Sequence, residues 1–134
     1  MKFTYIILIA AICCISFSSV HSKENKKLYV YYFHHTMRCQ SCLKIEDFAY
    51  KTLQKNFLKK LEDSTIVWLL VNLDEEKNFH FEDDYKLETQ SLVISLHIDG
   101  KETKWKNLDK IWDYIGSYKK FNKYVKKDIV KFLK

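Results

Sequence analysis

The spacing of two cysteines is the feature of this chain that carries the most chemical information. Cys39 and Cys42 are three positions apart, as in a dithiol that can close into a disulfide and reopen. A bond between them would close almost no loop and would constrain the unfolded chain little, so a purely structural role explains the pair poorly. We therefore expect a redox-active dithiol, with an incidental disulfide or two idle thiols as the alternatives.

The residues next to the pair favour the same chemistry. If a helix begins near Cys39, its unpaired N–H groups and its dipole favour the thiolate, so we predict Cys39 as the attacking thiol and the more buried Cys42 as the resolving thiol. Arg38 is the only arginine in the chain, and we expect its charge to assist the thiolate while its fork is free to hold an acidic group of a partner. His34 tunes the thiolate or shuttles protons, or it is a histidine satisfied by backbone.

Metal binding is the second hypothesis for the same residues. The M-x-C-x-x-C run that begins at Met37 has the spacing of copper-chaperone domains, whose thiolates select Cu(I), and zinc could use His34, His35, Cys39 and Cys42. The predicted order of elements counts against the copper domains, and adjacent histidines in a strand should point to opposite faces. We predict no metal and no cofactor. A non-catalytic carrier of Cu(I) or zinc is the alternative function.

A strand–helix–strand unit must position the dithiol. Apolar, β-branched and aromatic residues predict strands buried on both faces at 28–34 and 64–73. Between them, apolar residues three and four positions apart predict an amphipathic helix. A crossover of this kind makes the two strands parallel. The dithiol then lies where the first strand meets the first helix.

The rest of the chain adds a hairpin and further helices. Residues 91–98 predict a third strand, and Asp99-Gly100 predicts a tight turn into an edge strand at 101–106. The charged residues 74–89 predict a short helix with loops, and two helices are predicted at 108–115 and 118–134. The fold class is therefore α/β and thioredoxin-like: a central mixed sheet, made of a parallel βαβ unit and an antiparallel hairpin, flanked by helices.

The beginning of the chain is typical of a targeting segment. After Lys2, residues 3–17 are apolar and uncharged, and a short polar run follows. We predict a signal peptide over 1–22, or an uncleaved N-terminal anchor, with a lipoprotein signal as a weaker option. The thioredoxin-like domain spans 23–134 and is expected to be periplasmic or extracellular. Cys13 and Cys14 fall in the segment, so the mature domain keeps one cysteine pair.

The chain has a net positive charge, and apart from Arg38 its Lys+Arg residues are all lysines. There are 23 Lys+Arg against 17 Asp+Glu, with no proline and two glycines, which is typical of codon bias toward A and T. We expect a solvated lysine surface and no nucleic acid as partner. The basic helix at 118–134 could lie on an anionic membrane, but we expect it to cover the sheet.

The partner should be a protein dithiol, a protein disulfide or a redox subunit. Membrane association could occur through the N-terminal segment, and the protein should be a monomer.

The chain also resembles a known family over nearly all of residues 28–134. It is similar to the bacterial thioredoxin-like family of nitrophenyl-compound nitroreductase subunits, ArsF type, through VYYFHHTMRCQSC, NLDEEKNFHFEDDYKLETQSLVI and DGKETKWKNLDKIWDYIGSYKKFNKYV. The resemblance implies a thioredoxin-like fold and Cys39 and Cys42 as the functional dithiol. No flavin-binding signature accompanies it. Compared with thioredoxins, Ser91 or Leu92 stands where a cis-proline is usual, and Phe33 stands where a buried acid is usual.

Overall fold

A mixed four-stranded sheet forms the centre of the protein. The computed structural model describes residues 24–134, so the predicted signal segment at 1–22 lies outside the described residues. The strands lie in the order β2-β1-β3-β4, with β1 parallel to β2 and antiparallel to β3, and β3 antiparallel to β4. This confirms the predicted α/β sheet with a parallel unit and an antiparallel hairpin. The strands are β1 Lys26–His34, β2 Ile66–Asn72, β3 Ser91–Ile98 and β4 Lys101–Asn107.

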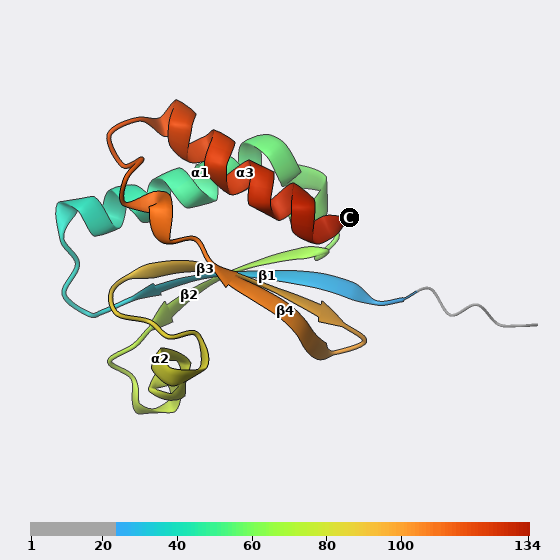
Figure 1. Cartoon of the computed structure of the whole chain (residues 1–134), viewed down its shortest axis with the longest axis horizontal. Helices are drawn as coiled ribbons and strands as arrows, with labels where there is room; N and C mark the ends of the chain where they lie inside the picture. Colours follow the sequence, from blue (N-terminus) through green and yellow to red (C-terminus); the bar gives the residue numbers. More distant parts are fainter. Residues whose placement is uncertain (1–23) are drawn as a thin grey trace, which may run out of the picture.

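Helices cover both faces of this sheet (Figure 1). The long helices α1 (Gln40–Glu62) and α3 (Tyr118–Leu133) lie on one face, and the short helix α2 (His80–Asp84) lies on the other. Two 3-10 turns complete the described chain, η1 (Glu76–Asn78) and η2 (Asp109–Ile111). Within residues 24–134, no helix has the length and apolar character that crossing a bilayer requires. This layering is compatible with a thioredoxin-like arrangement.

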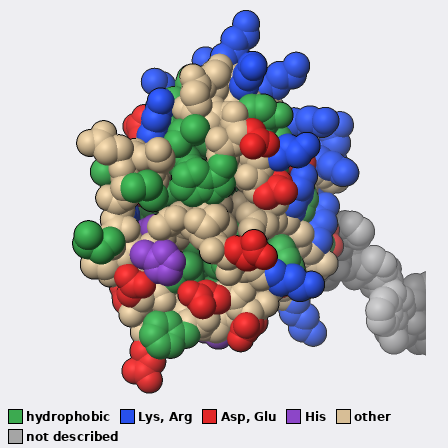
Figure 2. Space-filling view, turned by 60° about the vertical axis from the view of Figure 1, so that its left-hand side comes forward, with side chains coloured by type: hydrophobic (Ala, Val, Ile, Leu, Met, Phe, Trp, Pro, Cys, Tyr) green, Lys and Arg blue, Asp and Glu red, His purple; other side chains and the backbone are tan. Residues whose placement is uncertain are grey.

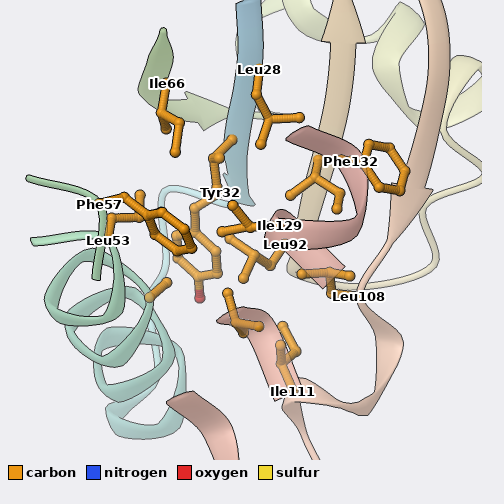
Figure 3. Close-up of a cluster of buried hydrophobic side chains, with 14 of the residues drawn as sticks. Leu28, Tyr32, Leu53, Phe57, Ile66, Leu92, Leu108, Ile111, Ile129 and Phe132 are labelled. Carbon is orange, nitrogen blue, oxygen red and sulfur yellow. The ribbon is translucent and has the colours of Figure 1, made fainter. Parts of the chain in front are cut away.

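The central strand β1 contributes to two separate cores. Successive side chains of a strand point to opposite faces. Leu28 and Tyr32 accordingly join the larger core beneath α1 and α3, where both are fully buried (Figure 3). Phe33 joins a smaller core with Tyr85 and Val93 on the α2 side. The prediction that this strand is buried on both faces is correct.

The helix α3 covers the sheet, as predicted for residues 118–134. Four of its apolar side chains are buried against the sheet: Phe121, Val125, Ile129 and Phe132. Ser117 caps the helix, because its hydroxyl accepts from the Lys120 backbone N–H at 3.5 Å. Covering the sheet is therefore one role of this helix.

The predicted burial of the second strand on both faces is wrong. β2 is an edge strand, and Ile66 is its only fully buried residue, while Leu70 is 47% exposed. A strand at the edge has one neighbour instead of two. Its apolar run therefore gains less cover than the same run would gain at the centre of the sheet.

The helix predicted at 108–115 is also shorter than expected. Only one 3-10 turn forms there, followed by irregular turns up to Gly116. Its bonds join residues three apart, from the Ile111 N–H to the Leu108 carbonyl at 3.2 Å and from the Tyr114 N–H to the Ile111 carbonyl at 3.3 Å. Because Ser117 already caps the next helix, too few residues remain for a stable α-helix of their own.

Candidate active site

The dithiol lies at the first turn of α1, as predicted. Cys39 is the N-cap residue with an extended backbone, and its Sγ accepts from the Cys42 backbone N–H at 3.1 Å. The two residues form a disulfide with their Cα atoms 5.1 Å apart. Cys39 is exposed, whereas Cys42 is 2% exposed. One sulfur can thus meet a partner while the other is shielded, which is compatible with a redox-active C-x-x-C pair.

The start of α1 favours a negative charge on Cys39. The first N–H groups of a helix have no partner within the helix, and the helix dipole places partial positive charge there. The first turn of α1 contains no acidic residue that would oppose this effect. A thiolate at Cys39 is therefore better stabilised than one in an ordinary loop.

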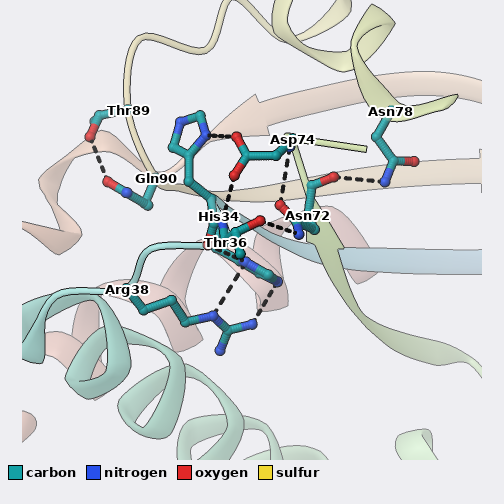
Figure 4. A network of polar contacts seen from close by, with 9 residues as sticks. His34, Thr36, Arg38, Asn72, Asp74, Asn78, Thr89 and Gln90 are labelled. Atoms are coloured by element: carbon teal, nitrogen blue, oxygen red, sulfur yellow. Dashed lines mark hydrogen bonds and ion pairs between the residues drawn. The ribbon is translucent and has the colours of Figure 1, made fainter. Parts of the chain in front are cut away.

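Arg38 is held by two neighbours, which differs from the free fork that we expected. Its Nη1 donates to the carboxylate of Glu46. Its Nη2 lies 2.6 Å from His34 Nε2, and Figure 4 shows the contact between these two side chains. The side chains of Arg38 and Glu46 are each 24% exposed. The charge of the Arg38 guanidinium is therefore partly balanced by a carboxylate of the same chain.

The contacts of His34 indicate which of its ring nitrogens donates and which accepts. Its Nδ1 lies 2.9 Å from the carbonyl oxygen of His35, which can only accept, so Nδ1 carries the hydrogen. Its Nε2 then accepts from Arg38, because a guanidinium can only donate. The 3.3 Å approach of Arg38 Nε to Nδ1 is consequently a contact rather than a hydrogen bond. In this arrangement His34 accepts a hydrogen bond from Arg38.

Tyr32, which sequence reasoning did not single out, lies beneath the dithiol. Its hydroxyl donates to the backbone carbonyl of Cys42 at 2.7 Å. Burial raises the pKa of the Tyr32 phenol far above its usual value, and the Glu46 carboxylate raises it further. Tyr32 therefore stays protonated and fixes the first turn of α1. Phe33, the residue in the position usual for a buried acid, faces the α2 side instead.

Glu46 is the second residue that sequence reasoning missed. It follows Cys42 by four positions, so both lie on the same side of α1. That spacing was the signal for a contact between Glu46 and Arg38, because the side of the helix that carries Cys42 must approach the loop that carries Arg38. Glu46 thus lies on α1 and contacts Arg38.

A polar network fixes the loop between β1 and α1. Asp74, which follows β2, accepts from the Thr36 backbone N–H at 2.7 Å and lies 2.7 Å from His35 Nδ1 (Figure 4). Asn72 donates to the Thr36 hydroxyl at 3.0 Å. The Thr36 N–H and the His35 side chain lower the pKa of Asp74 to about 2. The carboxyl ends of the two parallel strands are thereby tied together directly before Cys39.

The segment before β3 lies beside the end of β1. Ser91 is paired with Phe33, and Leu92 is paired with Tyr32. The Ser91 hydroxyl donates to the Thr89 carbonyl at 2.7 Å. Residues 24–134 contain no cis peptide bond.

The alternative metal ligands do not come together. His35 is bound to Asp74 and His34 to Arg38, so the two histidines have separate partners. No group of three or more His, Cys, Asp or Glu side chains within 24–134 is arranged to hold a metal ion. The donor set proposed for zinc is therefore not assembled in this structure.

Exposed apolar side chains precede and follow Cys39 in the sequence. Met37 is 86% exposed and Leu43 is 50% exposed, one on each side of Cys39 in the sequence. Figure 2, which brings the α1 start of the molecule forward, shows hydrophobic side chains among the polar ones on this face. Exposed apolar side chains next to a reactive group are suited to contact with a protein partner.

Comparison with known proteins finds no family for the chain. No protein-family model matches the sequence, and no curated protein matches it. The chemistry of the dithiol is therefore inferred from the residues of this chain.

Proposed function

We propose that the chain is an exported thioredoxin-like thiol–disulfide oxidoreductase or electron-relay subunit that works through Cys39 and Cys42. The observation that carries this proposal is the disulfide at the start of α1, with one cysteine exposed and the other buried. The β2-β1-β3-β4 sheet supports a thioredoxin-like fold, and the resemblance to the ArsF-type subunits agrees with it. Export is supported by the apolar run at 3–17.

The exchange proceeds in two steps that conserve electrons. The Cys39 thiolate attacks one sulfur of a partner disulfide, so a mixed disulfide forms and the partner's other sulfur leaves as a thiolate. The Cys42 thiolate then attacks Cys39, which closes the intramolecular disulfide and releases the second partner thiolate. Two electrons pass from the dithiol to the partner disulfide, which takes up two protons from solvent. The reverse sequence oxidises a partner dithiol.

The surroundings of Cys39 favour a protein partner over a small molecule. Met37 and Leu43, which precede and follow Cys39 in the sequence, offer exposed apolar area. The loop before Cys39 is tied to Asp74, so the sulfur is presented in a defined direction. The Arg38 guanidinium is already engaged by Glu46, and its charge acts on the thiolate without binding a partner carboxylate.

Trapping of a mixed disulfide tests this function. The background is the full chain with Cys13→Ser and Cys14→Ser, which leaves one cysteine pair. In that background Cys42→Ser, reduced and mixed with oxidised glutathione, should accumulate a mixed disulfide at Cys39. Cys39→Ser should react at least tenfold more slowly, because its remaining thiol is buried.

Two other results would change the assignment. Faster trapping through Cys42 than through Cys39 would reverse the roles of the two thiols. If the dithiol exchanges with no disulfide but binds stoichiometric Cu(I) or zinc, the carrier function replaces the redox function. Mass spectrometry of the intact protein distinguishes these outcomes.

A further inference from the structure

The outer face of α3 is densely and uniformly basic. Its single acid, Asp128, is buried and held by Lys106, whose Nζ lies 3.0 Å from both carboxylate oxygens. No exposed acid within α3 offsets the charge of its lysines. The exposed lysines of this helix and its C-cap are Lys119, Lys120, Lys123, Lys126, Lys127, Lys131 and Lys134.

The segment on the other side of the sheet, between β2 and β3, is rich in acidic side chains and poor in lysine. These acids lie in and around η1 and α2, where the lysines are Lys77 and Lys86. Figure 2 shows basic side chains along the upper and right-hand parts of the molecule and acidic ones mainly in the lower part. An ordinary solvated surface intersperses the two signs. The acids of residues 74–88 are Asp74, Glu75, Glu76, Glu82, Asp83, Asp84 and Glu88.

Tyrosines and an exposed valine lie among the α3 lysines. The rings of Tyr114 and Tyr124 lie 5.4 Å apart between centroids. Val130 is 37% exposed. Tyrosine and lysine together are typical of the membrane–water interface, whereas nucleic-acid phosphates are commonly bound by the arginine fork, which this face lacks. The tyrosines line a hollow of about 430 Å³ together with Lys120, Lys123 and Lys127.

The N-terminal segment joins the fold at the end of this same helix. Lys26, at the start of β1, donates from Nζ to the Leu133 carbonyl at 3.1 Å. The apolar run at 3–17 is separated from Glu24 by residues 18–23, which can reach at most roughly 20 Å. A bilayer that holds the apolar run is therefore within reach of the C-terminal half of α3.

We propose that the lysine face of α3 docks on the surface of an anionic lipid bilayer. The lysines would contact lipid phosphates, and Val130 and the exposed parts of the two half-buried tyrosines would face the headgroup region. The acidic α2 side would then face away from the membrane. The dithiol lies beyond the far end of β1 from Lys26, so it stays accessible to a partner. This inference is independent of the redox function.

Lysine footprinting on the full chain tests the docking directly. The chain is reconstituted in phosphatidylcholine vesicles with and without phosphatidylglycerol, and the acetylation rate of each lysine is measured by mass spectrometry. The lysines of α3 should be protected only when phosphatidylglycerol is present, and high salt should remove the protection. Lys77 and Lys86 serve as internal controls and should react equally in both vesicles.

Charge variants sharpen the test. Lys123→Gln with Lys127→Gln should weaken docking roughly 30-fold, read as lost protection of Lys126 and Lys131. The matched control, Lys77→Gln with Lys86→Gln, removes the same charge and should leave that protection unchanged. Equal acetylation of α3 in both vesicles, or equal effects of the two double variants, would overturn the proposal. Stronger protection by duplex DNA at equal phosphate concentration would assign the face to nucleic acid instead.

Discussion

At the scale of single residues, the reactivity of Cys39 depends on how far the positive charge of Arg38 is balanced by its other neighbours. The guanidinium lies next to Cys39 in the sequence, but its partners are Glu46 and His34. A cation paired with a carboxylate stabilises a nearby thiolate less than a free cation does. Arg38 and Glu46 should therefore act on Cys39 in opposite directions.

Replacing either partner should shift the reactivity of Cys39 in a predictable direction. Arg38→Met removes the cation and leaves Glu46 unbalanced, so the thiolate fraction at pH 7 should fall about three- to tenfold. Glu46→Gln frees the guanidinium charge, so the same fraction should rise. The measurement is the alkylation rate of Cys39 against pH. Arg38→Lys is the control and should keep most of the wild-type rate; identical profiles for all variants would show that Arg38 does not tune the thiol.

The placement of single residues was predicted correctly where it depends only on the local backbone. The spacing of apolar residues on α1 was enough to place Cys42 inward and Cys39 at the helix start. The contacts of Tyr32 and Glu46 could not be predicted, because each joins elements whose relative placement depends on tertiary packing. The partners of Arg38 also depend on tertiary packing. Because the sequence shows only that Arg38 adjoins Cys39, it suggested a guanidinium without partners in the chain.

At the scale of elements, Cys39 has a second role as the cap of α1. Its Sγ accepts from the Cys42 N–H, the bond that an N-cap side chain makes. Cys39→Ser keeps an acceptor in this position, whereas Cys39→Ala removes it, and neither variant can form the disulfide. Cys39→Ala should therefore have a free energy of unfolding about 1 kcal/mol lower than Cys39→Ser. Urea unfolding under reducing conditions measures the difference, and equal stabilities would show that the cap contributes nothing.

The tether of the β1–α1 loop should depend on pH through Asp74. Its pKa is lowered from 3.8 to about 2, so the contribution of the tether to folding is fully present above about pH 4. The contribution is lost as the pH falls through about 2, when the carboxylate takes up a proton. Asp74→Asn should remove the same contribution at neutral pH.

Amide hydrogen exchange measures this tether locally. In Asp74→Asn, the Thr36 amide should exchange faster, because it loses its charged acceptor. The Leu53 amide within α1 should be unaffected. Asp84→Asn is the matched control, since Asp84 is also an exposed carboxylate bound to a histidine. An unchanged Thr36 rate in Asp74→Asn would show that the carboxylate does not hold the loop.

The types of most elements were predicted correctly, but the burial of β2 and the helix at 108–115 were not. The order of strands and helices followed from runs of apolar, β-branched and aromatic residues and from helical patterns, and the Asp99-Gly100 turn joins β3 to β4 as predicted. The sheet edge at β2 could not be predicted, because an apolar run has the same sequence at the centre and at the edge. The segment at 108–115 failed because an eight-residue pattern has little helical stability of its own.

At the scale of the whole molecule, the sheet separates two cores and two surfaces of opposite charge. α1 and α3 cover the larger core, while α2 covers the smaller one. Composition predicted the lysine excess but not its placement, since side-chain counts carry no information about which face a residue joins. The Lys106–Asp128 pair between β4 and α3 was likewise not predicted, because the two residues are joined only by packing of the helix on the sheet.

That pair should respond unequally to loss of either partner. The Asp128 side chain is 10% exposed, whereas Lys106 is 42% exposed and can be solvated without its partner. Lys106→Met leaves a buried carboxylate unpaired and should lower the free energy of unfolding by about 2 kcal/mol. Asp128→Asn leaves an accessible ammonium and should lower it by about 1 kcal/mol. Chemical denaturation measures both, with Lys104→Met as the control, because Lys104 is on the same strand and contacts the Phe132 ring. A larger loss in Asp128→Asn than in Lys106→Met would show that the lysine, not the carboxylate, needs the partner to fold.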